Sequence, residues 1–421
     1  MKIPLKRLNK LLSDKIIKTI RLIGKICGDR GFSCYLVGGT VRDLILGVPQ
    51  LDIDLVTEVE ISSILKGIPK KYSVKRKESR FGTAKLVFEE GFSIDIAQTR
   101  KETYPYPGAL PSVEKSNIEE DIKRRDFTIN TLLMDIGKEN LGKIYDHLGG
   151  IKDIEDGVIR VLHDKSFIDD PTRIFRAFRF KERFSLRFAQ ETKKLLYNAI
   201  KISAIKNLTP QRIRKELFLI LREKTWGKTV ISLSENNILK QLGLKKELKS
   251  KTLTMFEKIL GGMKKMKGNQ EIAKLTLITE NESIEDIDNF SRIVGLKRKE
   301  KELLCIIRRE GKRIFQKLAR GENSRAEIFQ ILHPLPHDGL IYFLGKGNIK
   351  VRRNIMLYLD ELKEVKTKIG GNDLKKLGIK EGPLYQKILK TVLNKKINGE
   401  LKTKREEIEF AKYLYKKICN R

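Results

Sequence analysis

The first 150 residues combine two hydrophobic patterns, whereas the rest of the chain shows mainly one. Apolar side chains at helical spacing predict a helix over residues 14–30, and a second, short helix is expected at 41–47. Short apolar or alternating runs predict strands at 32–37, 51–56, 72–76, 84–88 and 92–97. From about residue 151 the apolar spacing is helical almost throughout. The pattern predicts an α+β protein, with a small mixed-sheet head followed by helices.

Four consecutive parts are expected along the chain. Residues 1–150 form the head, and three helical parts follow, which we name the neck, body and tail: residues 151–225, 226–360 and 361–421. The stretch 101–117 contains three prolines and a glycine, so it is predicted to be a loop without regular structure. Long loops in compact domains are often functional, which makes this stretch a candidate lid.

Acidic residues recur on two of the predicted strands. Asp52 and Asp54 lie two positions apart, so both point to one face of their strand. Neighbouring carboxylates repel each other unless a cation lies between them, and Mg²⁺ is typically bound by one or two carboxylates together with substrate phosphates. Asp95 has a similar setting on the strand at 92–97. The three residues suggest metal-assisted phosphoryl or nucleotidyl transfer, although a solvated strand face would give the same pattern.

Two glycines follow the strand at 32–37. Gly38 and Gly39 separate it from the short helix, whose free N–H groups would point at an anion that the glycines allow to approach. Arg42 lies one turn into that helix. Such a pair alone is also typical of an ordinary turn, but together with Arg42 and the aspartates it favours a triphosphate-binding loop. A basic cluster at 123–125 follows the candidate lid, and we interpret it as a further phosphate contact.

The neck contains a second informative segment at 169–179. Asp170 suits a helix N-cap, and Pro171 suits the first helical position. Arg173, Arg176 and Arg179 recur every third residue, so they share one side of the predicted helix. An amphipathic helix with a solvated basic face would show the same pattern.

Composition narrows the class of partner. Lys and Arg total 88 of 421 residues against 54 for Asp and Glu, which gives a formal net charge of +34. An excess of this size indicates a polyanionic partner, above all nucleic acid. The four cysteines and four histidines show no metal-binding spacing, and no apolar run is long enough for a signal peptide or a membrane span. We therefore expect a cytoplasmic protein with reduced thiols.

Six stretches together resemble the class II tRNA nucleotidyltransferase and bacterial poly(A) polymerase family, in the DNA polymerase beta superfamily. In family order they are residues 36–43, 51–55, 124–130, 146–150, 169–179 and 209–217. The segment 371–383 also resembles the tail of a subgroup of bacterial tRNA nucleotidyltransferases. The resemblance implies a nucleotidyltransferase head, a neck that recognises the nucleotide base, and a tail that binds tRNA.

The resemblance also implies roles for the residues that match. Asp52 and Asp54 would hold the catalytic Mg²⁺ ions, and Asp95 stands at the family's third acidic position. The nucleotide would be bound by Gly38, Gly39, Arg42, Arg125, Asp169, Asp170, Arg173, Arg176 and Arg179. The family often has Glu at the position of Asp169, so the contribution of that residue to reading the base stays open.

The implied reaction adds C and/or A to the 3′ end of tRNA from CTP and ATP, with release of pyrophosphate and without a nucleic-acid template. Asp170 only accepts hydrogen bonds and Arg173 only donates them, which complements the amino group and ring nitrogen that cytosine and adenine share. Three alternatives stay open: an enzyme that adds only A or only CC and works with a second nucleotidyltransferase, a poly(A) polymerase, and a non-catalytic RNA-binding protein on the same scaffold.

Overall fold

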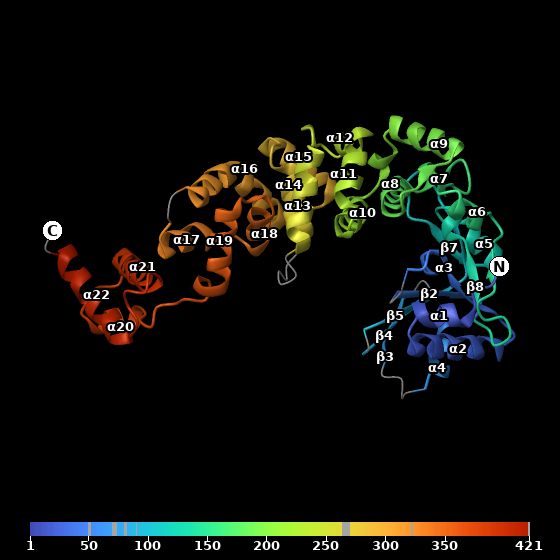
Figure 1. Ribbon diagram of the computed structural model, residues 1–421, viewed down its shortest axis with the longest axis horizontal. Coiled ribbons are helices and arrows are strands. Elements are labelled where there is room, and N and C mark those ends of the chain that lie inside the picture. Colours follow the sequence, from blue (N-terminus) through green and yellow to red (C-terminus); the bar gives the residue numbers. More distant parts are fainter. Residues whose placement is uncertain are drawn as a thin grey trace. The chain divides into compact units, whose positions relative to one another are not determined.

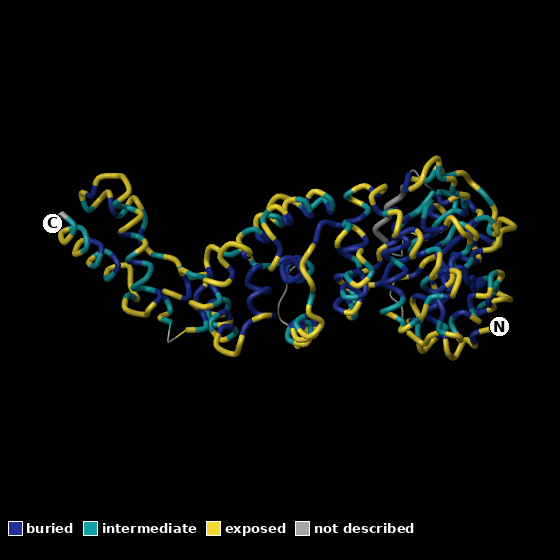
Figure 2. The backbone as a smooth tube through the Cα atoms, turned by 90° about the horizontal axis from the view of Figure 1, so that it is seen from above, coloured by how far each residue is buried: buried dark blue, intermediate teal, exposed yellow. Residues whose placement is uncertain are grey.

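The computed structural model describes residues 1–48, 52–69, 74–79, 82–89, 91–262, 270–320 and 323–419. Two compact units make up the chain, Met1–Gln241 and Leu242–Arg421, and each has its own buried interior (Figure 2). Within the described residues every strand belongs to the first unit (Figure 1). This arrangement confirms the predicted mixed-sheet head followed by helices.

The head contains a seven-stranded mixed sheet in the order β3-β4-β5-β2-β1-β8-β9. Its strands are β1 (Cys34–Val37), β2 (Asp52–Thr57), β3 (Val74–Ser79), β4 (Thr83–Phe88), β5 (Ser93–Gln98), β8 (Leu133–Asp135) and β9 (Ile144–Tyr145). The central pair β2–β5 is parallel, and the other pairs are antiparallel. The five predicted strands are present with small shifts at their ends, although residues 51 and 72–73 lie outside the described residues.

Helices α1 (Leu5–Leu11), α2 (Asp14–Gly28) and α4 (Ile61–Gly67) pack with the sheet around one shared apolar core. The predicted helix at 14–30 is therefore confirmed, and Ser13 caps it by accepting a hydrogen bond from Ile16 N at 3.3 Å. Ile53 and Leu55 of β2 point into this core. Because side chains alternate along a strand, Asp52 and Asp54 point to the opposite face of the sheet.

A hairpin at residues 100–115 corrects the prediction of a loop without regular structure. Strands β6 (Arg100–Thr103) and β7 (Ser112–Lys115) pair antiparallel, and the prolines and the glycine lie in the tip, residues 104–111. Polar residues dominate both strands, so the sequence lacks the alternation of apolar residues from which strands are predicted. The hairpin closes on itself, because Ser116 N donates to Thr99 O at 3.2 Å and Thr99 Oγ1 donates to Ser116 O.

The rest of the first unit is almost entirely helical, as predicted. Its helical elements are α3 (Gly39–Ile45), α5 (Ile118–Lys123), η1 (Thr128–Asn130), α6 (Gly150–Glu155), α7 (Ser166–Asp169), α8 (Thr172–Phe184), α9 (Gln190–Lys201), η2 (Ala204–Asn207), α10 (Pro210–Arg222), α11 (Trp226–Glu235) and α12 (Ile238–Gln241). A short parallel pair, β10 (Val158–Ile159) with β11 (Arg187–Phe188), lies among them. Helix α8 packs against α10 and α11, which buries its apolar side.

The described part of the second unit is helical. Its helices are α13 (Ser250–Gly262), α14 (Gln270–Thr279), α15 (Ile284–Val294), α16 (Arg298–Ala319), α17 (Arg325–Leu332), α18 (His337–Lys346), α19 (Ile349–Leu357), η3 (Tyr358–Leu362), α20 (Gly371–Lys376), α21 (Pro383–Ile397) and α22 (Lys404–Cys419). The last three share a separate apolar cluster. The predicted boundaries near residues 150, 225 and 360 stay predictions.

None of the helices in the described ranges has the length and apolar character that a membrane crossing requires.

Candidate active site

A cavity of about 620 Å³ lies in the first unit, between the sheet and helix α8. Most of the residues predicted from the sequence line it: Gly38, Gly39, Arg42, Asp54, Asp95, Arg125, Asp170, Arg173 and Arg176. Asp52, Asp169 and Arg179 are not among its lining residues. The fold thus brings acidic strand residues, the glycine loop and the start of the neck helix to one place.

Carboxylates lie on adjacent strands at the base of the cavity. Asp54 on β2 is directly opposite Asp95 on β5, and Lys85 on β4 is opposite Asp95 on the other side. Lys85 Nζ binds Asp95 Oδ2 at 2.7 Å, and Asp52 Oδ1 accepts a hydrogen bond from Ser93 Oγ at 2.7 Å. The Asp54 side chain is open to the cavity, yet desolvation by the surrounding protein and repulsion from Asp95 raise its pKa to about 6. Negative charge is therefore concentrated where β2 and β5 adjoin.

These carboxylates fit a hard divalent cation that is shared with a substrate. Across the described ranges, no three His, Cys, Asp or Glu side chains are grouped closely enough to hold a metal ion by themselves. Mg²⁺ does not need such a group, since it usually binds one or two carboxylates and takes its other oxygens from water and phosphates. A cation here would also offset the repulsion that raises the pKa of Asp54.

Gly38 allows the backbone to pass close to an arginine. Its φ of +64° is a conformation that residues with a side chain rarely adopt, and a Cβ at this position would lie 3.1 Å from Arg125 Nη1. Arg125 Nη2 binds Asp121 at 2.7 Å. The buried Nε of Arg125 has no hydrogen-bond partner among the described residues. Arg125 thus places a guanidinium group beside the glycine loop.

Arg42 lines the cavity, and each of its three nitrogens already makes one polar contact within the protein. The guanidinium lies over the rings of Phe184 and Phe180, 4.4 and 5.1 Å from their centroids. Nε donates to Asp43 Oδ1 at 2.8 Å, and Nη1 donates to Asn130 Oδ1. A direct phosphate contact, which the resemblance implies, would use the N–H groups of Nη1 and Nη2 that these contacts leave over.

Sequence reasoning missed Asp126, which connects the glycine-loop side of the cavity to the neck. Its Oδ1 accepts from Asn130 Nδ2 and from Phe127 N at 2.9 Å each. Its Oδ2 accepts from Arg176 Nε at 2.8 Å and Nη2 at 2.6 Å. Burial alone would raise the pKa of Asp126, but Arg176 and the Asn130 hydrogen bond lower it to about 2. The stretch 124–130 indicated a site, but nothing in it identified this acceptor.

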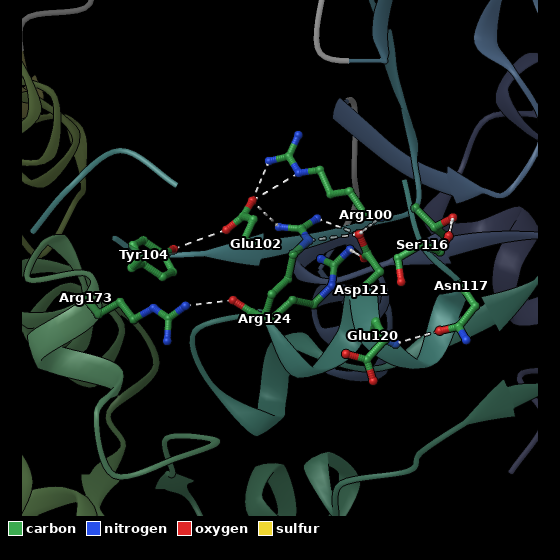
Figure 3. A network of polar contacts seen from close by, with 11 residues as sticks. Arg100, Glu102, Tyr104, Ser116, Asn117, Glu120, Asp121, Arg124 and Arg173 are labelled. Atoms are coloured by element: carbon green, nitrogen blue, oxygen red, sulfur yellow. Dashed lines mark hydrogen bonds and ion pairs between the residues drawn. The ribbon is translucent and has the colours of Figure 1, made fainter. Parts of the chain in front are cut away.

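A second set of polar contacts joins the hairpin to α5 (Figure 3). Glu102 on β6 accepts from Arg124 Nη1 at 3.0 Å and from the Tyr104 hydroxyl at 3.2 Å. The fully buried Asp121 also accepts from Arg124, at 2.7 Å. Arg124 O accepts from Arg173 Nη2 at 2.7 Å, which extends the contacts to α8. Glu102, Tyr104 and Arg124 all line the cavity. Arg124 belongs to the basic cluster that was interpreted as a phosphate contact, whereas Glu102 and Tyr104 were not predicted as site residues.

The predicted base-reading residues lie at the start of α8, which begins at Thr172, one residue later than predicted. Asp170 Oδ1 still accepts a hydrogen bond from Thr172 N at 3.0 Å. Arg173 donates to Ser166 Oγ at 2.6 Å. The alternative of a solvated basic face is wrong, because Arg173 and Arg179 are only 3% and 7% exposed. Residues distant in the sequence surround this side of the helix, and periodicity could not reveal them.

Besides Asp52, two further predicted residues lie outside the cavity wall. Asp169 Oδ2 is 3.9 Å from His163 Nδ1. The Arg179 guanidinium faces Glu216 and Glu223 at 3.9 Å each. Their roles in nucleotide binding stay predictions.

Comparison with known proteins agrees with this geometry. Residues 34–160 match the family described as the poly A polymerase head domain. An A-adding tRNA nucleotidyltransferase of Geobacter sulfurreducens is 34% identical over 96% of this chain and 48% of its own length. Another, of Halalkalibacterium halodurans, is 29% identical over 97% of this chain and 95% of its own length. The chain thus spans about half the length of the first relative and nearly all of the second.

A solved structure has the same fold along almost the whole chain. The apo form II of a CCA-adding enzyme gives a TM-score of 0.79 at 30% sequence identity, and the match covers 96% of this chain and 97% of that one. The chain therefore belongs to the tRNA nucleotidyltransferase family whose head is the poly(A) polymerase head domain.

Proposed function

We propose that this nucleotidyltransferase adds A to the 3′ end of tRNA and that a second nucleotidyltransferase adds the preceding C residues. The observation that carries the proposal is the shared cavity, which unites Asp54 and Asp95 with Asp170 and Arg173. Both relatives described above are A-adding enzymes, which favours addition of A alone. The similarity to a CCA-adding enzyme supports a second candidate, in which this chain adds the complete CCA.

In the proposed reaction the tRNA 3′ oxygen attacks the α-phosphorus of ATP. A bond from this oxygen to phosphorus forms, the bond to the β-phosphate oxygen breaks, and pyrophosphate leaves. The family is typically metal-dependent, and Asp52 and Asp54 would hold Mg²⁺. The bound ions supply a lower pKa for the attacking hydroxyl and stabilisation of the leaving oxygens. Asp95, on the neighbouring strand, would orient the hydroxyl.

The phosphates would lie against the glycine loop. Gly38 and Gly39 let the backbone approach the guanidinium groups of Arg125 and Arg42, whose positive charge favours a phosphate at this loop. Arg42 and Arg176 keep positive charge at the wall of the cavity. Binding and orientation of this kind, with charge neutralisation, account for most of the protein's part in phosphoryl transfer.

Base selection would depend on Asp170 and Arg173. The carboxylate accepts from the amino group of adenine or cytosine, and the guanidinium donates to the adjacent ring nitrogen. Guanine and uracil present the reverse pattern, which leaves two mispaired groups at a cost of about 1–3 kcal/mol each. We expect selectivity for A and C to fall in Asp170→Ala and Arg173→Ala.

The second substrate would be the acceptor arm of tRNA. A net charge of +34 favours contact with an RNA backbone, and the resemblance assigns such contacts to the helical tail. Because its substrates would be tRNA and ATP, we propose that the protein acts in the cytoplasm.

Nucleotide incorporation tests the proposal. Each labelled nucleoside triphosphate is supplied with Mg²⁺ to three tRNAs, which lack CCA, end in C, or end in CC. Addition of a single A to the CC-ending tRNA alone would support the A-adding enzyme. Addition of C, C and A would select the second candidate, and a growing A ladder on any RNA would indicate a poly(A) polymerase. Absence of incorporation would contradict both candidates and favour an RNA-binding protein.

A variant pair links any activity to the cavity. Asp52→Ala/Asp54→Ala is expected to abolish incorporation, because it removes both proposed metal-binding carboxylates. Asp29→Ala removes an exposed carboxylate of the head outside the cavity and serves as the matched control. Equal activity of the two variants would rule out the proposed metal site.

A further inference from the structure

Arg212 on α10 connects two segments that are far apart in the sequence. Its Nη1 donates to Gly108 O at 2.6 Å and to Ala109 O at 3.2 Å, both in the hairpin tip. Its Nη2 donates to Asp170 Oδ1 at 2.6 Å. The Arg212 and Asp170 side chains are 17% and 19% exposed, so this charge-assisted pair is largely shielded from water. One side chain thus holds both the hairpin tip and the proposed base-reading carboxylate.

The hairpin tip has little freedom where Arg212 holds it. Gly108 N donates to Ile168 O and to Asp169 O at 3.2 Å each. Gly108 has a φ of +75°, and a Cβ at this position would lie 2.7 Å from Asn207 Cβ. The tip therefore lies directly against the ends of α7 and η2, and no larger residue fits at position 108 without displacing it.

The same contacts distinguish the two oxygens of Asp170. Oδ1 accepts from Thr172 N at 3.0 Å and Thr172 Oγ1 at 2.6 Å, in addition to Arg212. Oδ2 accepts no hydrogen bond from any described residue, although Asp170 lines the cavity. Because three donors hold Oδ1, the carboxylate cannot turn freely. It therefore presents a fixed oxygen to whatever base enters.

We propose that Arg212 is a positioning residue that determines base specificity, because it fixes the Asp170 carboxylate and the hairpin tip in one arrangement. This inference rests on the proposed function, in which Asp170 reads the base. Without the guanidinium, Asp170 keeps only its Thr172 donors and can turn. A carboxylate that turns can also accept from the two N–H donors of guanine, so the site no longer rejects that base.

The test compares variants of the full chain. Arg212→Met removes all three donated bonds, and Arg212→Lys keeps the charge with fewer donors. Lys215→Met removes an exposed charge from the same helix and is the matched control. The first measurement is the ratio of kcat/KM for ATP to that for GTP on a CC-ending tRNA. The second is hydrogen–deuterium exchange of the peptide spanning residues 104–111, which does not depend on activity.

For Arg212→Met we expect the ATP to GTP ratio to fall by about tenfold and exchange in the tip to accelerate. The change in ratio should come mainly from a lower KM for GTP, Arg212→Lys should recover part of it, and Lys215→Met should match the wild type. An unchanged ratio would overturn the proposal, including the case in which activity with ATP and GTP falls equally, since that is the mark of a merely structural role. Unchanged hydrogen–deuterium exchange in Arg212→Met would overturn the inference that Arg212 fixes the hairpin tip. If the wild type incorporates no nucleotide, the proposed function fails instead, and the exchange measurement still tests the tip.

Discussion

At the scale of single residues, buried carboxylates that bind arginines hold the site together. Asp126 binds Arg176, and Asp121 binds Arg124 and Arg125. The motif at 124–130 predicted that this segment belongs to the site. It could not predict the pairing, because Arg176 lies 50 residues away and a partner's identity depends on the tertiary fold.

Asp126→Asn is expected to destabilise the protein by about 3 kcal/mol at pH 7, because it removes the buried charge of Asp126 and leaves the half-buried Arg176 without the carboxylate that it binds. The difference from the wild type should depend on pH. The pKa of Asp126 is about 2 in the folded protein and about 3.9 in an unfolded chain, so its stabilising effect is complete above pH 5 and is lost as the pH falls toward 2.

Urea unfolding at pH 7, 5, 4 and 3 measures this effect. The free-energy difference between the wild type and Asp126→Asn should stay constant from pH 7 to 5 and shrink below pH 4. A difference that grows on acidification would contradict the assigned ion pair.

Gly38→Ala should affect stability and nucleotide binding together. The positive φ alone costs about 1–2 kcal/mol for a residue with a Cβ, and this Cβ would also meet Arg125 at 3.1 Å. Gly31 offers a matched control, since its φ is +79° and no atom lies within 4 Å of a Cβ there. We expect both variants to lose stability in thermal unfolding, and only Gly38→Ala to raise KM for ATP. A similar KM for the two variants would separate Gly38 from the phosphate site.

At the scale of elements, periodicity predicted those helices and strands that bury an apolar side. Strands β1, β2, β4 and β5 and the helix at 14–30 are of this kind. The hairpin was missed because β6 pairs only with β7 and is stabilised by polar contacts such as Glu102 with Arg124. Helix α8 shows the opposite error, since its arginine spacing was also compatible with a solvated face, yet Arg173 and Arg179 are buried. Arg173 donates to Ser166 and Arg124, and Arg179 faces Glu216.

The contact between α8 and α10 includes a buried pair with incomplete hydrogen bonding. Arg179 Nη2 and Glu216 Oε2 are 3.9 Å apart, and neither Arg179 Nε nor Glu216 Oε2 has a hydrogen-bond partner in the described part of the chain. Burial raises the pKa of Glu216 despite its arginine neighbours. Removal of one partner from such a pair leaves an uncompensated buried charge. It therefore destabilises the protein more than replacement of both partners by apolar side chains.

We therefore expect Arg179→Met alone to destabilise the protein by about 3 kcal/mol, and Arg179→Met/Glu216→Leu to recover most of that loss. Urea unfolding of the two single variants and the double variant completes the cycle. Additive effects would show that the two side chains do not interact.

At the scale of the whole molecule, the resemblance of six motifs in family order predicted the family, composition indicated a polyanionic partner, and the hydrophobic pattern predicted a mixed-sheet part followed by helices. Division into parts was harder to foresee. The structure separates two units after Gln241, whereas local periodicity cannot show which helices share a core. The net charge of +34 is also a property of the whole molecule, and it predicts how tRNA affinity depends on salt.

Binding of tRNA should weaken steeply with salt, because each phosphate contact releases a condensed counterion. If about six phosphates are contacted, affinity should fall by about a thousandfold between 50 and 200 mM salt. Fluorescence anisotropy of labelled tRNA over this range measures the slope, and binding of ATP serves as the comparison with few charges. A slope as small as that of ATP would contradict an extended RNA interface.

The bonded ends of the hairpin have a consequence for evolution. Thr99 and Ser116 contact each other directly, so residues 100–115 form an insert whose two ends are adjacent in the fold. Mutations of exposed residues in the two strands can then accumulate while β5 and Asp95 stay in place, whereas Gly108 is constrained by its contacts with Arg212 and Asn207. A lineage can thereby acquire a new substrate range by altering one insert, without rebuilding the strands that carry out the reaction.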